Sequence, residues 1–294
     1  MRERDIGIGI VVVVLWGLNF IAIKMGLQDV PPLLLGTLRF LFACVPAIFF
    51  FPKPPIPWSW LIALGLSINV GQFSLLFMGM KVGMPAGLAS LVLQSQAFFT
   101  LLIGVVWLGE RWQWNHLAGL IVSGSGMVII GSLQGGEMTL AGFGLTVAAA
   151  VCWGIGNVIM RRATLGVASF SMVSLVIWAG AVAILPLALL SLILEGYDTW
   201  VIAYHSPTWT SVGSIVYLAY LATLAGYGLW GKLLSRYPAA VVSPLALLVP
   251  IVGMSSSACL LGEKLSLWQG VGGMLVMTGL VVHVFGSRWR FNKK

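Results

Sequence analysis

Three polar residues stand in a row near the middle of a long apolar run. The run extends from Pro85 to Leu108, and its stretch "LVLQSQAFFT" contains Gln94, Ser95 and Gln96. Its length is close to the ~20 residues that a helix needs to cross about 30 Å of hydrocarbon. An amide that faced lipid tails would cost several kcal/mol, by order of magnitude, for lack of a partner. We therefore expect these side chains to face protein or a polar interior.

The positions of these residues on a regular helix suggest a shared lining. At about 100° per residue, Ser90, Gln94, Gln96 and Thr100 lie within an arc of ~160°, while Ser95 points elsewhere. Gln94 and Gln96 then flank a common face, which could bind a polar molecule. The alternative is that they form hydrogen bonds between helices that hold the bundle, worth about 0.6 kcal/mol each.

Two prolines and two asparagines could complete such a lining. Pro244 and Pro250 lie in the apolar run 240–261, where each should free a carbonyl about one turn earlier and bend the helix. Freed carbonyls are tolerated in a membrane only beside protein or water. Asn19 and Asn157 occur in matching stretches, "WGLNFIAIK" and "WGIGNVIMR". Together these residues predict a central polar cavity near the middle of the bilayer.

Arg39 is the one charged residue well inside a predicted span. Such a residue should face the protein interior or a water-filled cavity. It could bind substrate or take part in gating, or it could have a structural partner such as freed carbonyls.

Several aromatic residues also lie inside predicted spans. Aromatic faces can hold an ammonium group by cation–π attraction, although core packing is the alternative for each ring. These candidates are Trp16, Trp153, Trp178 and Tyr227, with Trp230 beside them.

The predicted spans contain few residues that could catalyse a reaction, carry a proton or bind a metal. No Asp or Glu occurs in the middle of any span, and His116, His205 and His283 lie at ends, in a loop or isolated. An intramembrane enzyme would need a nucleophile with a base, or converging metal ligands. We therefore expect no catalytic residue, no metal site and no cofactor, and we interpret the three cysteines as packing residues.

The elements that must position these residues are membrane helices. The chain has 294 residues, of which 59% are hydrophobic and only 8% charged, against roughly 25% charged in a typical soluble domain. Its apolar runs predict an all-α membrane protein with ten transmembrane helices in a lipid bilayer. The runs are near 6–23, 33–51, 60–80, 85–108, 115–132, 141–160, 169–194, 211–231, 240–261 and 267–286.

The net charge of +8 follows the bilayer and does not indicate a nucleic-acid partner. When the chain is threaded from an inside N-terminus, twelve Lys and Arg residues fall on the cytoplasmic side, and only Lys24, Lys81 and Lys264 fall outside. This asymmetry satisfies the positive-inside rule and predicts a multi-pass protein of a bacterial inner membrane with both termini in the cytoplasm. The segment 195–209 becomes the largest external loop.

The chain repeats itself. At an offset of 153 residues, "MPAGLAS" (84–90) aligns with "YPAAVVS" (237–243), and "LGER" (108–111) aligns with "LGEK" (261–264). This predicts two five-helix repeats, residues 1–137 and 138–294. Because five is odd, the second repeat enters the membrane from the opposite side, and inverted repeats are typical of transporters that work by alternating access.

The repeated unit, the "GE" pairs and the ten runs resemble the EamA family of the drug/metabolite transporter superfamily. The stretches "VVLWGLNFIAIKMGL", "GMPAGLASLVLQSQAFFT" and "GYGLWG" look like its O-acetylserine/cysteine exporter branch. The resemblance implies export of O-acetylserine, cysteine and related amino acids.

The residues alone indicate a small, nearly neutral, zwitterionic substrate. A phosphorylated sugar or nucleotide would need several positively charged side chains inside the spans, and Arg39 is the one predicted there. An exporter of aromatic amino acids or other hydrophobic metabolites is the main alternative. An enzyme or a scaffold is a more distant one, and the oligomeric state stays open.

Overall fold

The computed structural model describes residues 1–109, 113–132, 138–167 and 170–291. The first five spans begin with α1 (Glu3–Asp29) and α2 (Pro32–Ile48). The third is α3 (Trp58–Leu64), η1 (Gly65–Gln72) and α4 (Phe73–Lys81), and the fourth is α5 (Ala86–Val92), η2 (Leu93–Ser95) and α6 (Gln96–Leu108). The fifth is α7 (Trp114–Ser132).

The next five spans repeat this order. They begin with α8 (Leu140–Thr164) and α9 (Met172–Leu194), and the short α10 (Tyr197–His205) follows in the segment that the sequence placed in a loop. The eighth span is α11 (Trp209–Val216), η3 (Tyr217–Ala225) and α12 (Gly226–Leu234). The ninth is α13 (Ala239–Val242), η4 (Ser243–Leu248) and α14 (Val249–Leu261), and the tenth is α15 (Leu267–Phe291).

These helices confirm the predicted all-α membrane protein. Among the described residues, nine helical spans are long and apolar enough to cross a membrane, and α2 is a shorter apolar helix of 17 residues. At 1.5 Å per residue, α2 is about 25 Å long, slightly short of the ~30 Å hydrocarbon core. It ends at Ile48 and not at the predicted residue 51, because the Phe50 and Phe51 amides bond back to Ala47 in a turn.

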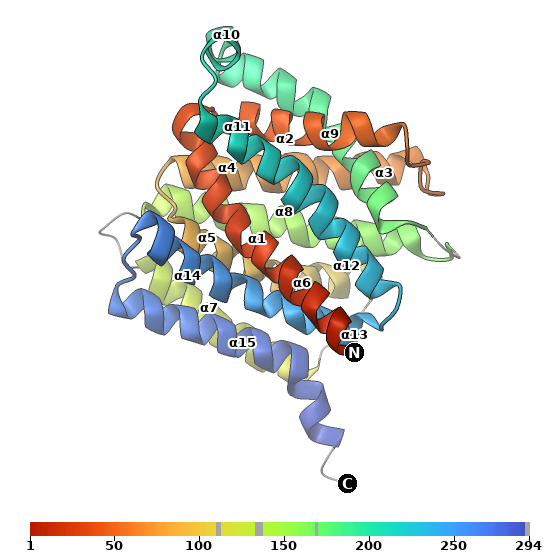
Figure 1. The fold of residues 1–294 in the computed structure, drawn as a ribbon. Helices are drawn as coiled ribbons and strands as arrows, with labels where there is room; N and C mark the ends of the chain where they lie inside the picture. The colour runs from red at the N-terminus through yellow and green to blue at the C-terminus, as the bar shows by residue number, and fades with distance from the viewer. Residues whose placement is uncertain (110–112, 133–137, 168–169, 292–294) are drawn as a thin grey trace.

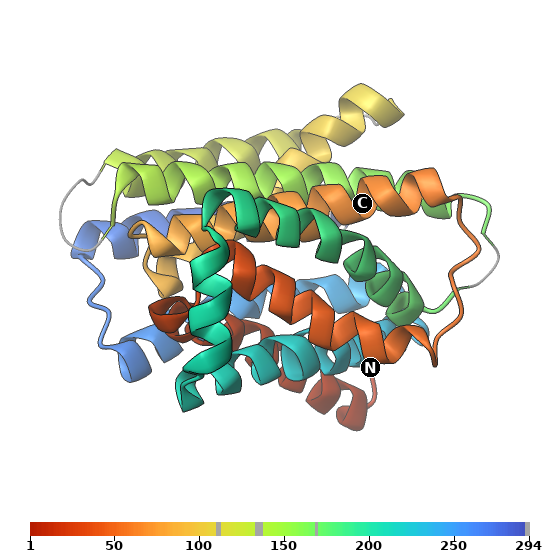
Figure 2. The same ribbon diagram turned by 90° about the horizontal axis from the view of Figure 1, so that it is seen from above.

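The spans run back and forth between two ends of the bundle (Figure 1). We call the end at which α1 begins the N-terminal face and the end at which α1 finishes the opposite face. The N-terminal face lies at the right of Figure 1, and the loops at residues 30–31, 82–85 and 262–266 lie at its left. In the view from above, α10 lies crosswise to the other helices, between α9 and α11 (Figure 2).

Irregular turns occur at matching places in the two sets of spans. The third and eighth spans each contain a π-helical segment, η1 and η3, and the fourth and ninth each contain a 3₁₀ segment, η2 and η4. In the ninth span Pro244 and Pro250 account for the interruption, because each lacks the amide hydrogen that continues a helix. No proline accompanies η2, so the sequence signal is present on one side only.

Helices from the two sets of spans pack on one another. The pairs α7 with α15, α2 with α9, and α5 with α14 contact each other along their lengths. Glycines permit the closest approach: a Cβ on Gly126 would lie 2.5 Å from the Gly272 carbonyl oxygen, and one on Gly119 would lie 2.6 Å from that of Gly279. Small residues at such crossings are typical of membrane helices, where packing drives association.

Candidate functional site

Arg39 lies at the centre of a buried polar group formed by three spans. Its side chain comes from α2, and the residue is 3% exposed. Nε donates to Thr223 Oγ1 of η3 at 3.1 Å, and Nη1 donates to Asn19 Oδ1 of α1 at 3.3 Å. The guanidinium carbon also lies 4.2 Å from the centre of the Phe73 ring. Among the described residues, no carboxylate contacts this cation, so its charge is held by neutral acceptors and an aromatic face.

Trp16 forms an aromatic group one helical turn from Asn19. Its ring centre lies 5.2 Å from those of both Tyr227 and Trp230 on α12. Trp16 Nε1 donates to the Ala222 carbonyl at 3.1 Å, in the segment that carries Thr223. These three half-buried rings lie between the first and eighth spans, one turn of α1 from Asn19.

Gln94 binds a backbone group that the ninth span cannot fully satisfy by itself. Its Nε2 donates to the Ala246 carbonyl at 3.0 Å. In a continuous α-helix that oxygen would accept from residue 250, which is proline and has no amide hydrogen. The amide of Val249 also bonds to the same oxygen in the 3₁₀ segment. Gln94 thus joins the fourth span to the proline-interrupted ninth span.

Gln96 bonds to α8 and not to the ninth span. Its Oε1 accepts from Asn157 Nδ2 at 2.7 Å, and the same nitrogen donates to Thr100 Oγ1 at 3.1 Å. The sequence placed Gln94 and Gln96 at the two flanks of a common face and assigned Asn19 and Asn157 to the same cavity. The structure instead directs the two glutamines to η4 and α8 and places the asparagines in separate polar groups. On a regular helix the two side chains already point about 160° apart, so each can reach a different neighbouring span.

The other two candidate tryptophans, Trp178 and Trp153, contact other parts of the bundle. Trp178 Nε1 donates to the Phe51 carbonyl at 3.0 Å, and its ring meets that of Trp58 edge-on, both close to the N-terminal face. Trp153 is half-buried and packs against the main hydrophobic core. The sequence placed Trp178 well inside a span because it began that span at residue 169, whereas α9 begins at Met172.

Several residues of the polar interior were missed by the sequence reasoning. Phe73 and Thr223 contact Arg39, and Asn69 and Gln72 are buried in the π-helical segment of the third span. Gln72 is 4% exposed, and its Oε1 has no hydrogen-bond partner among the residues that the structure describes. Asn69 and Gln72 carried the same signal as Gln94, a polar residue inside an apolar run, and could have been found by it.

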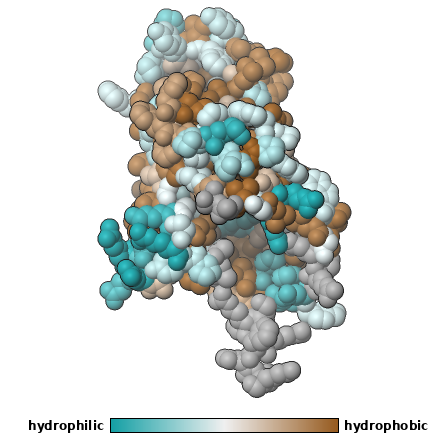
Figure 3. Space-filling view, turned by 90° about the vertical axis from the view of Figure 1, so that its right-hand side faces the viewer, coloured by the Kyte–Doolittle hydropathy of each residue, from teal (hydrophilic) through white to brown (hydrophobic). Residues whose placement is uncertain are grey.

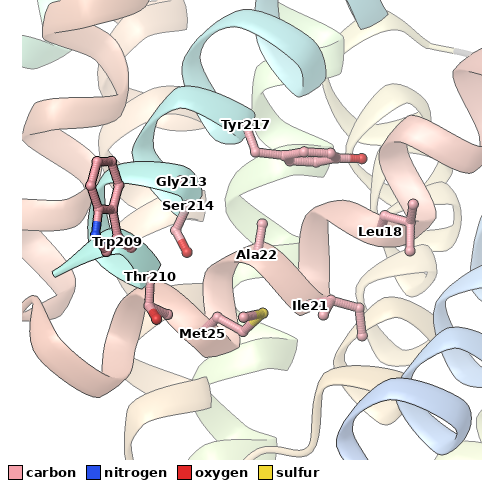
Figure 4. Close-up of a pocket in the computed structure, with 9 residues that line it drawn as sticks. All are labelled: Leu18, Ile21, Ala22, Met25, Trp209, Thr210, Gly213, Ser214 and Tyr217. Atoms are coloured by element: carbon pink, nitrogen blue, oxygen red, sulfur yellow. The ribbon is translucent and has the colours of Figure 1, made fainter.

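A separate apolar pocket lies between α1 and α11. It has a volume of about 280 Å³, and Figure 4 shows its lining side chains. Ala22 and Met25 project from α1, and Gly213 and Tyr217 come from the facing span. No charged residue is among the described residues that line it, so it is not part of the Arg39 group.

Comparisons with known proteins agree with this architecture. The model of the "EamA-like transporter family" matches residues 5–132 and 140–285. A solved crystal structure aligns over 98% of this chain and 98% of its own, with a TM-score of 0.64 and 19% identity, which shows the fold alone.

Three curated relatives cover almost the whole chain. Proteins from Escherichia coli (strain K12) and Salmonella typhimurium, each named a probable amino-acid metabolite efflux pump, are 45% and 46% identical over 292 residues, which is 99% of this chain and 98% of each relative. A probable terminal-alkyne amino-acid exporter of Streptantibioticus cattleyicolor is 30% identical over 93% of this chain and 91% of its own. The chain therefore belongs to the EamA-like transporter family.

Proposed function

We propose that this transporter exports small zwitterionic amino acids and related metabolites, of the O-acetylserine and cysteine kind, across a bacterial inner membrane. It works by alternating access between two inverted five-helix repeats, residues 1–137 and 138–294. The observation that carries the proposal is the buried Arg39 cation, which contacts no carboxylate of the described residues. A substrate carboxylate is the partner that this cation lacks.

Arg39 has unused N–H donors that could bind a substrate carboxylate. A guanidinium has five N–H donors, and the bonds to Thr223 and Asn19 use two of them. Five minus two leaves three, which is enough for the two parallel bonds that a carboxylate forms with arginine. The two neutral residues hold the guanidinium in place and do not neutralise it.

The aromatic group supplies a site for the ammonium end. Trp16 and Asn19 are three residues apart on α1, so about 4.5 Å of helix rise separates them. Aromatic faces attract ammonium groups most strongly when water is excluded, and Trp16, Tyr227 and Trp230 are all half-buried. A molecule with both charges close together suits this arrangement, whereas a polyanion would find only one deep cation among the described residues.

The names of the relatives support the same substrate class. Two of them are probable amino-acid metabolite efflux pumps, and a third is a probable terminal-alkyne amino-acid exporter. The distribution of Lys and Arg supports a cytoplasmic location for both termini, and hence for the N-terminal face.

Ligand-dependent thermal unfolding of the purified protein tests this proposal. A ligand at 100 times its Kd stabilises the folded state by about 2.7 kcal/mol. We expect O-acetylserine and cysteine to raise the melting temperature, and matched compounds without the carboxylate or without the ammonium to raise it much less. Arg39→Met should strongly reduce the rise. Equal stabilisation by the amine that lacks the carboxylate would contradict the assignment of Arg39.

A further inference from the structure

The matching segments at the start of the fourth and ninth spans differ sharply in exposure. All side chains from Met84 to Ser95 are buried. In the corresponding segment, residues 237–248, Val242 is the one buried side chain among those described. Ser90 is 1% exposed, whereas its counterpart Ser243 is exposed.

This difference in burial distinguishes the two ends of the bundle. Residues 84–95 lead inward from the opposite face, and residues 237–248 lead inward from the N-terminal face. Both segments are apolar and their first seven residues align, so overall polarity does not account for their different burial. The side chains of α5 are covered by their neighbours at the opposite face, whereas most described side chains of α13 and η4 are only partly covered at the N-terminal face. Figure 3 views that N-terminal face, where hydrophilic and hydrophobic side chains are interspersed.

Glu263 forms the contact that closes the opposite face around α5. Its Oε1 accepts from the Ala86 amide at 2.7 Å, and its Oε2 accepts from the Gly87 amide at 2.9 Å. Glu263 is 8% exposed and follows α14, whereas α5 belongs to the first repeat. The carboxylate thus satisfies two amides that a helix leaves free in its first turn, and it lies at the positive end of the helix dipole.

The adjoining surfaces of α5 and α14 fit closely along the same line. A Cβ on Gly87 would lie 2.4 Å from Ser257 Oγ, and a Cβ on Gly253 would lie 2.6 Å from Ser90 Oγ. Helices that touch in this way leave no passage for a substrate between them. For the opposite face to open, α5 and α14 must separate, and the bonds of Glu263 must break.

We propose that Glu263 is a positioning residue that latches the transporter shut at the opposite face, and that the structure is the state open toward the N-terminal face. This inference rests on the proposed alternating access. It does not depend on the identity of the substrate. Loss of the latch shifts the population of carriers toward the state that is open at the opposite face.

Two single-cysteine reporters at repeat-matched positions test the latch. Cys44, Cys152 and Cys259 are replaced by alanine, and either Ser90→Cys or Ser243→Cys is introduced. We call these two proteins the Ser90 reporter and the Ser243 reporter. A membrane-impermeant thiol reagent is added to intact cells or to inside-out vesicles. With Glu263 in place, the Ser243 reporter should react from the N-terminal face, and the Ser90 reporter should be protected from both sides.

Glu263→Gln keeps the size of the side chain and removes its charge. We expect it to raise the labelling rate of the Ser90 reporter from the opposite face about tenfold, a shift of about 1.4 kcal/mol, and to slow the labelling of the Ser243 reporter. Glu263→Asp keeps the charge on a shorter side chain and should raise the labelling rate of the Ser90 reporter less. Glu195→Gln is the matched control, because Glu195 accepts from the amides of Leu33 and Leu34 at the same face without touching α5.

The latch is supported if Glu263→Gln speeds labelling of the Ser90 reporter and slows labelling of the Ser243 reporter, while Glu195→Gln changes neither rate. Continued protection of the Ser90 reporter in Glu263→Gln, or equal exposure in both variants, would overturn it. An unreactive Ser243 reporter with Glu263 in place would overturn the assignment of the open face. The labelling uses no substrate, so a failure of amino-acid transport with intact reciprocal labelling counts against the proposed substrate and not against the latch.

Discussion

Replacing Arg39 separates a binding role from a structural role. We expect Arg39→Met to leave the fold intact and to remove most of the affinity for amino acids. The buried cation is costly to keep out of water, so its replacement by an apolar side chain of similar length is nearly neutral for stability. Thr223 keeps a partner after the change, because its hydroxyl donates to the Leu218 carbonyl at 2.8 Å.

The expected loss of affinity follows from the hydrogen bonds. A hydrogen bond to a charged group contributes about 1.5–3 kcal/mol, which corresponds to a change in KM of about 10–150-fold at ~1.4 kcal/mol per decade. Arg39→Lys should be intermediate. An ammonium has three donors, and Thr223 and Asn19 would engage two of them. One donor then remains for substrate, and we expect KM to rise about tenfold.

Counterflow of labelled amino acid in proteoliposomes provides KM, and a thermal unfolding curve of the same preparation provides the stability. The expected pattern is a large rise in KM for the methionine variant, a smaller rise for the lysine variant, and melting temperatures within a few degrees of the parent. A methionine variant with the parent KM would refute the binding role. The binding role would also be refuted if the lysine variant binds substrate normally and the methionine variant fails to fold. The charge would then be required for folding and not for substrate binding.

Four further changes have expected outcomes. Gln94→Leu removes one partner of the Ala246 carbonyl, so it should strongly reduce counterflow and lower the free energy of unfolding by about 1 kcal/mol; normal transport would restrict Gln94 to packing. Trp16→Leu should raise KM more for amino acids than for matched acids without an ammonium, whereas Trp16→Phe keeps a ring and should have a smaller effect. Gly126→Val should destabilise the protein by ~3 kcal/mol or more in thermal unfolding, because its Cβ would lie 2.5 Å from the Gly272 oxygen. An imposed proton gradient should not concentrate substrate, and counterflow should persist without a pH difference; uphill accumulation driven by protons would contradict this facilitator behaviour.

The membrane architecture could be predicted from the sequence because its signal is long and local. Each span is an apolar run near the length of a bilayer, and the charges at its ends indicate direction. α2 was found by the same rule even though it is shorter than the other spans. The short α10 was missed, since its polar and aromatic residues resemble a loop.

The polar interior was only partly predictable. Arg39 was recognised as a buried charge, but its partner Thr223 lies 184 residues away, and no periodicity gives the rotation of two helices against each other. The interruption at η4 could be anticipated from Pro244 and Pro250, whereas η2 has no proline. Gln94 and Gln96 bond to different spans, η4 and α8, and the sequence pattern does not identify those partners.

Counterflow by the unmodified protein tests the central proposal most directly. Proteoliposomes are loaded with unlabelled O-acetylserine, and trace labelled O-acetylserine, cysteine or an aromatic amino acid is added outside. We predict transient accumulation of labelled O-acetylserine and cysteine above the level in protein-free liposomes, and little accumulation of the aromatic amino acid. Accumulation of the aromatic amino acid alone, or of none of the three, would contradict the proposed export of small zwitterions.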